Sequence, residues 1–269
     1  MKTRYLYKYF FRNALHSFLF WLVLFVVGFE FVGPFMLKIN LMLDQAGQDN
    51  SSMIGKMILE QLNLNLYILG FFLGPALGIL AGRALVQKES EVLLAHRISR
   101  RSFFLGSFTF YGAFLVAIWL LFVLLYLLVT YIFRQPITVS LLFKLLISVF
   151  GILLPFLWVG FLSVNFKPVA VIMIYLIVFL TIPPIAAAFD RPGQSLQQKV
   201  FAVSAKTVAL VVPQAQPFQL IASPFSRSDT GGSGFSVRTW FAYGLVWSVF
   251  LLLSGFLIFR SKDLIDPHS

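Results

Sequence analysis

The sequence contains no cysteine and few charged residues. The lack of cysteine excludes disulfide bonds, thiolate catalysis and cysteine ligands for a metal. Charged residues fill 12% of the 269 positions, about half the fraction usual in soluble globular domains, whereas hydrophobic residues fill 59%. The three histidines are far apart in the sequence, which therefore predicts no metal site. This composition places the chain in a lipid bilayer.

The apolar tracts predict an all-α polytopic membrane protein. A bilayer admits only helices or closed barrels, and uninterrupted tracts such as 114–133 lack the alternation of barrel strands. A crossing helix needs about 20 mostly apolar residues. We expect one transmembrane domain over 1–269, with six spans at about 17–37, 62–82, 103–133, 145–166, 168–189 and 239–259. The first tract is too long for a cleavable signal peptide.

The basic residues predict the orientation of these spans. With both termini in the cytoplasm, 12 of the 21 Lys and Arg residues lie beside the spans on the cytoplasmic side. The prediction is thus N-in and C-in, in the cytoplasmic (inner) membrane, with several crossings. This topology accounts for the net charge of +11, and without a separate basic domain we expect no nucleic-acid partner.

Two regions outside the spans carry further expectations. The segment 190–238 contains Lys206, Pro213 and Pro217, so we predict an outer broken helix, either re-entrant or interfacial. The first twelve residues place aromatic side chains among basic ones. This pattern is typical of a short helix at the headgroup level, and equally of a simple basic anchor for the first span.

The loop 84–102, between the second and third predicted spans, has an unusual order of residues. It begins acidic, passes through an apolar patch, turns basic and runs directly into the third span. An apolar patch can dock in a groove of a soluble partner while arginines pair with its carboxylates. The candidate partner-binding residues are Glu89, Glu91, Leu93, Leu94, His96, Arg97, Ile98, Ser99, Arg100 and Arg101.

This loop resembles the first cytoplasmic loop of the ABC-2 type transporter permease family. The matching features are the acidic pair at 89 and 91, the leucine pair at 93–94, the Ile-Ser-Arg at 98–100 and the Leu-Gly at 105–106. The chain departs from the family pattern at Arg97, where proline is usual, at Ser107, where lysine is usual, and in lacking Gly-Thr before the leucine pair. The resemblance extends to the six spans, the cytoplasmic termini and the outer broken segment.

The resemblance implies the membrane-spanning permease subunit of an ATP-binding cassette transporter, in the direction of export. The chain has no phosphate-binding G-x-x-x-x-G-K-[ST] motif, so we expect it to bind no cofactor and to be no enzyme by itself. ATP and Mg would be bound by a separate ABC ATPase subunit, present as a homodimer. The loop 84–102 would act as the coupling loop to that ATPase, and the chain would pair with a second copy of itself or with a homologous permease.

Glu30 is a carboxylate within the first predicted span. An intramembrane carboxylate is costly, so it is a candidate for the translocation path. A partner such as Lys38 or a water-filled vestibule gives it an equally simple structural role. A membrane-embedded enzyme would need converging polar groups, a channel would need a filter motif, and a secondary transporter would need internal repeats. We see none of these three signals in the sequence.

Overall fold

The computed structural model describes residues 2–18, 20–22, 24, 25, 27, 28, 51–86, 99–132, 136–188 and 237–261. Within these ranges every regular element is a helix, which confirms the all-α prediction. The helices are α1 (Lys2–Leu15), α3 (Ser51–Val86), α5 (Arg100–Ile132), α6 (Val139–Ser163), α7 (Pro168–Ala188) and α10 (Val237–Ser261).

Four of these helices are long and apolar enough to cross a membrane. Their qualifying stretches are Ile58–Val86, Arg100–Ile132, Leu141–Ser163 and Phe241–Ser261. They correspond to the predicted second, third, fourth and sixth spans. The predicted fifth span corresponds to α7, whose described apolar stretch, Pro168–Val178, is shorter than a crossing. Most of the predicted first span, and nearly all of the outer segment 190–238, lie outside the described residues.

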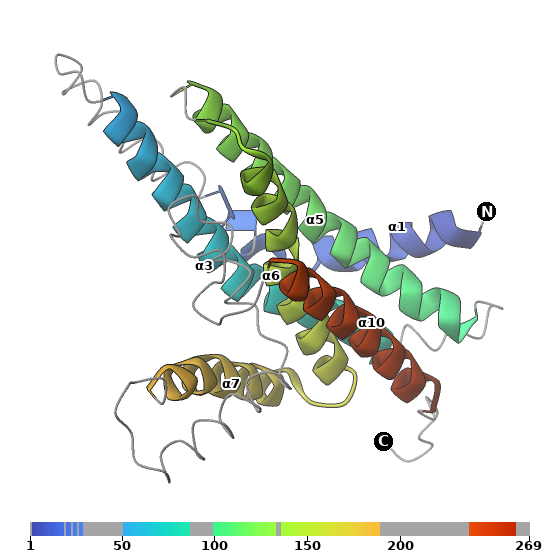
Figure 1. The fold of residues 1–269 in the computed structure, drawn as a ribbon. Helices are drawn as coiled ribbons and strands as arrows, with labels where there is room; N and C mark the ends of the chain where they lie inside the picture. Colours follow the sequence, from blue (N-terminus) through green and yellow to red (C-terminus); the bar gives the residue numbers. More distant parts are fainter. Residues whose placement is uncertain are drawn as a thin grey trace, which may run out of the picture.

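The four long helices form a bundle in which α3, α6 and α10 run in one direction and α5 runs in the other (Figure 1). The contacts fix these directions. Gly74 and Gly78 lie against Ile152 and Phe156, so residue numbers rise together along α3 and α6. α5 is antiparallel to them, and near its start the Ser107 hydroxyl donates to the carbonyl of Ala81 close to the end of α3, at 2.9 Å.

The tightest contact in the bundle joins α3 to α6. Gly74, Gly78 and Gly82 are spaced four residues apart, so they form one stripe on α3. A Cβ added at Gly78 would lie 2.5 Å from the carbonyl oxygen of Phe156 and 2.9 Å from the backbone nitrogen of Gly160. Small residues at such a stripe let two backbones approach closely, which is how helices gain packing energy where burial from water does not drive their association.

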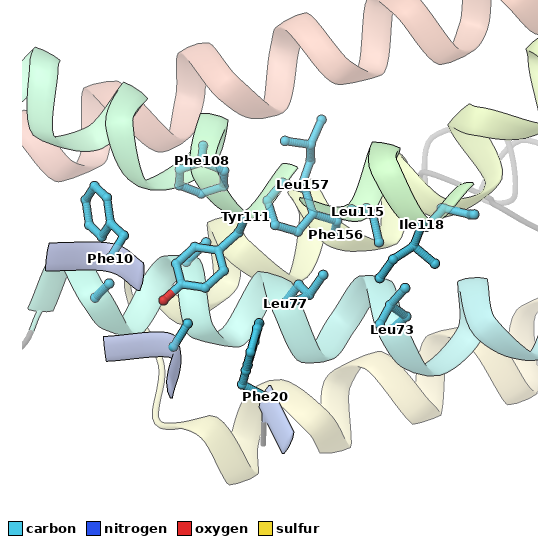
Figure 2. Packing of buried hydrophobic residues seen from close by; sticks show 14 of the residues in the cluster. Phe10, Phe20, Leu73, Leu77, Phe108, Tyr111, Leu115, Ile118, Phe156 and Leu157 are labelled. Carbon is cyan, nitrogen blue, oxygen red and sulfur yellow. The ribbon is translucent and has the colours of Figure 1, made fainter. Parts of the chain in front are cut away.

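Aromatic side chains fill the space between α6 and α5. Phe156 from α6 and Phe108 from α5 have ring centroids 5.8 Å apart, at an angle of 65°. Figure 2 shows these rings in one layer with Leu77 of α3 and with Leu115 of α5. The ring of Phe108 is accommodated because glycine stands at Gly160 on α6, where an added Cβ would lie 2.7 Å from a ring carbon. Glycine stripes and phenylalanine side chains therefore complement one another in the core.

A proline in α3 explains how α7 is attached. Pro75 has no N–H, so it cannot make the helical hydrogen bond to the carbonyl of Phe71. The hydroxyl of Tyr175, on α7, donates to that carbonyl at 3.0 Å. The ring of Tyr175 also packs against the ring of Phe71, with centroids 5.6 Å apart. The proline thus creates an acceptor in an apolar environment, and α7 supplies the donor.

A second buried polar contact joins α5 to α6. The indole N–H of Trp119 donates to the hydroxyl of Ser148 at 3.0 Å, and that hydroxyl donates to the carbonyl of Leu145 at 2.6 Å. Both Trp119 and Ser148 are buried. The chain of two hydrogen bonds satisfies an indole that would otherwise lie unpaired among apolar side chains.

Candidate functional site

Basic side chains gather at one end of the bundle. This end contains the end of α3, the start of α5, the end of α6, the start of α7 and the end of α10 (Figure 1). The basic residues there, together with those on α1 whose side chains the structure describes, are Lys8, Arg12, Arg83, Arg100, Arg101, Lys167 and Arg260. Glu60, the one acidic residue within the described ranges, lies towards the other end of α3. We call this region the basic end.

Ser99 is the N-cap of α5 and therefore fixes where the third helix begins. Its hydroxyl accepts a hydrogen bond from the backbone N–H of Ser102 at 3.1 Å, and its carbonyl accepts from the N–H of Phe103 at 3.0 Å. A serine at this position satisfies N–H groups that have no partner within the helix. The loop 84–102 thus ends in a defined structural signal, which sequence analysis had treated only as part of a partner-binding motif.

Arg100 connects the start of α5 to the end of α10. Its guanidinium donates to the carbonyl of Arg260 at 2.9 Å. The last carbonyls of a helix have no helical partner and carry partial negative charge, so a cation there is favourable. Phe104 packs against Phe259 beside this bond, with ring centroids 5.9 Å apart. Arg100 is therefore half-buried in a contact within the chain.

Arg101 differs from its neighbour, because its side chain is exposed and has no hydrogen bond or ion pair among the described residues. Two arginines in the first turn of a helix oppose the helix dipole, since the N-terminal end carries partial positive charge. Arg100 is compensated by the carbonyl of Arg260. Arg101 has no such compensation within the described ranges, so it is a cation at this end that remains available to a partner or to headgroups.

The other predicted partner-binding residues are not described by the structure. Glu89, Glu91, Leu93, Leu94, His96, Arg97 and Ile98 all lie outside the described residues, between the end of α3 and Ser99. Glu30, the candidate for the translocation path, also lies outside them. The structure does bring together the two ends of this loop, since Ala81 of α3 accepts the hydroxyl of Ser107 of α5.

The N-terminal helix α1 also packs on the start of α5, which sequence analysis did not anticipate. Leu6, Phe10 and Ala14 are buried, and they form one face because they are four residues apart. Phe10 packs against Phe103, with ring centroids 5.4 Å apart, and a Cβ at Gly106 would lie 3.3 Å from the ring of Phe10. α1 crosses α5 at an angle (Figure 1). The i, i+4, i+8 spacing of its apolar residues was the available signal.

The chain turns sharply after α1, at His16 and Ser17. The backbone N–H of Ser17 donates to the carbonyl of Ala14 at 3.0 Å, and the carbonyl of Ser17 accepts from the N–H of Phe20 at 3.1 Å. The indole N–H of Trp21 donates back to the carbonyl of Leu15 at 2.8 Å. α1 is therefore a separate helix from the segment that follows.

A cavity of about 450 Å³ lies between this turn, α3 and α5. Its polar lining comes from Asn13, His16, Ser17, Arg83 and Tyr111. Three apolar side chains complete it: Phe18, Leu80 and Ala84. No three His, Cys, Asp or Glu side chains that could hold a metal ion come together within the described part of the chain.

Comparisons with protein-family models, with curated proteins and with solved structures found no match to this chain.

Proposed function

We propose that this chain is the membrane-spanning permease subunit of an ATP-binding cassette transporter, and that it exports a substrate with energy from ATP hydrolysed by a separate ABC ATPase subunit. The observation that carries the proposal is the loop 84–102, which is acidic, then leucine-rich, then basic, and which leads directly into α5. This order is what the resemblance to ABC-2 permeases rests on. The proposal includes a second copy of this chain, or a homologous permease, as the other half of the membrane part.

The contacts of α5 support a coupling role for this loop. The first eight residues of α5 contact the end of α10 through Arg100 and Phe104, and contact α1 through Phe103. A displacement of the loop by a partner would therefore move α5, α10 and α1 together, because close-packed side chains transmit displacement. A loop that served only to orient the chain would need its positive charge but not these contacts.

The gathered basic residues support the six-span, N-in and C-in topology. Cytoplasmic segments of membrane proteins carry an excess of Lys and Arg, and here residues far apart in the sequence meet at one end. The absence of native cysteine allows a direct test, since single cysteines can be labelled without background. We expect a cysteine at Ser90 to be protected from a membrane-impermeant maleimide in intact cells. Cysteines at Ser51 and Ser195 should react, and the reverse pattern would show that the orientation is wrong.

The proposed function is tested by reversing one charge at the start of α5. In Arg101→Glu the exposed cation becomes an anion without breaking the bond from Arg100 to α10. Lys167→Glu is the matched control, because Lys167 is an exposed cation at the same end, just before α7. The partner in this test is an ATPase with a G-x-x-x-x-G-K-[ST] motif encoded beside this chain, and the readout is its co-purification with each variant.

We expect Arg101→Glu to reduce co-purification and the control to leave it unchanged. Loss of one partner from a desolvated charge pair weakens association by about 2 to 5 kcal/mol, whereas a solvated charge contributes far less. Correct insertion of each variant is established first with the cysteine at Ser90. If Arg101→Glu, and also replacement of Leu93 and Leu94 by aspartate, leave association intact in a correctly inserted chain, the loop is not the coupling element and the proposal fails.

A further inference from the structure

The cavity at the turn after α1 carries an inference that does not depend on an ATPase partner. Its polar side chains can all donate hydrogen bonds, and none of them is acidic. Glu60 has the one carboxylate side chain within the described ranges, and it lies more than twenty residues before Arg83 on α3. A cavity lined by donors and a permanent cation selects an anionic, oxygen-rich ligand and rejects a metal ion.

Arg83 is the charged group of this cavity. It stands three residues before the end of α3, its side chain is exposed, and it has no hydrogen bond or ion pair within the described part of the chain. Arginine at the end of an apolar helix extends its charged group towards the headgroup layer while its stem covers apolar surface. The guanidinium offers a fork of N–H donors that matches two oxygens of one phosphate.

Tyr111 adds a second hydrogen-bond donor to the cavity. The residue is 1% exposed, so its ring is held firmly in the core, and it lines the cavity together with Arg83. Figure 2 shows the ring of Tyr111 leaving α5 with its hydroxyl directed towards the pale blue N-terminal segment, where the turn after α1 lies. A tyrosine hydroxyl at the wall of a cavity can donate a hydrogen bond to an anionic oxygen of a ligand, and such charge-assisted hydrogen bonds are stronger than neutral ones.

The position and the apolar part of the lining favour a lipid over a soluble anion. Leu80 and Ala84 continue the wall along α3, and Phe18, with 81% of its surface exposed, stands beside the polar groups. A ligand with a phosphate and an acyl chain would place its phosphate against Arg83 and its acyl chain along Phe18. Basic pockets between membrane helices on the cytoplasmic side bind anionic headgroups by the same physics.

We propose that this cavity binds the phosphate group of an anionic phospholipid, with Arg83 as the main charge and with Tyr111 and the turn at His16 and Ser17 as hydrogen-bond donors. A bound lipid would connect α1 to the end of α3, immediately before the loop 84–102. The volume of about 450 Å³ lies in the usual range for small-molecule sites, and it accommodates a headgroup phosphate with part of its glycerol.

The test uses the full chain in detergent micelles and native mass spectrometry, with phosphatidylglycerol as the anionic probe and phosphatidylcholine as the neutral one. We expect one phosphatidylglycerol to remain bound per chain and phosphatidylcholine to be lost. Arg83→Gln should weaken binding about tenfold or more, because a hydrogen bond to a charged group contributes more than a neutral one. Tyr111→Phe keeps the ring and removes only the hydroxyl, so it should weaken binding about two- to tenfold.

Arg12→Gln is the matched control, since Arg12 is an exposed arginine on α1 that does not line the cavity. It should leave phosphatidylglycerol binding unchanged. Equal losses in Arg12→Gln and Arg83→Gln would overturn the proposal, as would equal retention of the two lipids by the wild-type chain. Unchanged binding in Tyr111→Phe would also overturn it, and this variant is the one least able to disturb folding.

A competition arm separates the two sources of phosphate. Inorganic phosphate at millimolar concentration should not displace phosphatidylglycerol, because it lacks the acyl chain that contacts Phe18 and Leu80. If inorganic phosphate displaces the lipid and its binding also depends on Arg83, the cavity is a site for a soluble phosphate and the lipid assignment is wrong.

Discussion

The contact between α3 and α6 predicts that an added methyl group has opposite effects at two glycines. At Gly78 an added Cβ would lie 2.5 Å from the carbonyl oxygen of Phe156, whereas an ordinary contact begins at 3.4 Å. All three of its nearest atoms belong to the backbone of α6, so no side-chain rotation can relieve the overlap. At Gly112 on α5 the nearest atom would be a ring carbon of Phe156 at 3.5 Å, an ordinary contact.

The magnitudes follow from two opposing terms. Overpacking a well-packed core lowers the free energy of unfolding by about 1 to 3 kcal/mol. Replacing glycine by alanine within a helix raises it by about 1 kcal/mol, because the unfolded chain loses freedom. In Gly78→Ala the backbone overlap places the first term near its upper end, so we expect a net destabilisation of about 1 to 2 kcal/mol. In Gly112→Ala only the second term operates, and we expect stabilisation by up to about 1 kcal/mol.

The measurement is reversible unfolding in mixed micelles by a denaturing detergent, followed by tryptophan fluorescence or circular dichroism. The two variants add the same methyl group to the same kind of residue, so the sign of each shift is informative. If both variants were stabilised, or both were destabilised by the same amount, α3 and α6 would not be in backbone contact at Gly78. Gly78→Leu should prevent the native contact altogether.

Two further predictions concern buried hydrogen bonds. Tyr175→Phe should lower the free energy of unfolding by about 1 kcal/mol, the range measured for hydrogen bonds between membrane helices, because it removes a donor to the carbonyl of Phe71, to which Pro75 cannot donate. In a Pro75→Ala background the helix can supply its own N–H, so Tyr175→Phe should cost less there; equal costs in both backgrounds would contradict the assignment. Ser148→Ala should destabilise by about 1 to 2 kcal/mol, because it leaves the indole N–H of Trp119 unpaired. In a Trp119→Phe background, Ser148→Ala should lower the free energy of unfolding by less than it does in the wild-type chain. Equal losses in the two backgrounds would show that this hydrogen bond does not contribute to stability.

The hydrophobic pattern predicts the long helices well but their ends less well. The second predicted span, 62–82, is contained in α3, yet α3 begins at Ser51. The added residues include Lys56, Glu60 and Gln61, which interrupt the apolar tract from which the span was predicted. The start of α6 had a readable signal, since the hydroxyl of Thr138 accepts the N–H of Leu141 as an N-cap.

The contacts at the basic end could not be read from the sequence. The spacing of Gly74, Gly78 and Gly82 indicates a close-packed face, but nothing in it identifies α6 as the partner. Arg100 and Arg260 are 160 positions apart, and both fit the positive-inside rule equally well without touching. The difference between Arg100, which caps α10, and Arg101, which is exposed, depends on tertiary structure alone.

The parallel pairing of α3 with α6 also has a consequence for the order in which the chain is assembled during its synthesis. α3 leaves the ribosome before α5, and α5 before α6, because the chain is made from its N-terminus. α5 can pair with α3 at once as an antiparallel neighbour, through contacts such as that between Ser107 and Ala81. The glycine face of α3, by contrast, has to wait in the membrane until the segment from Val139 to Ser163 has been inserted. Nascent chains that end after α5 should therefore expose this face to lipid or to the insertion machinery, and the insertion of α6 is the step of biogenesis that covers it.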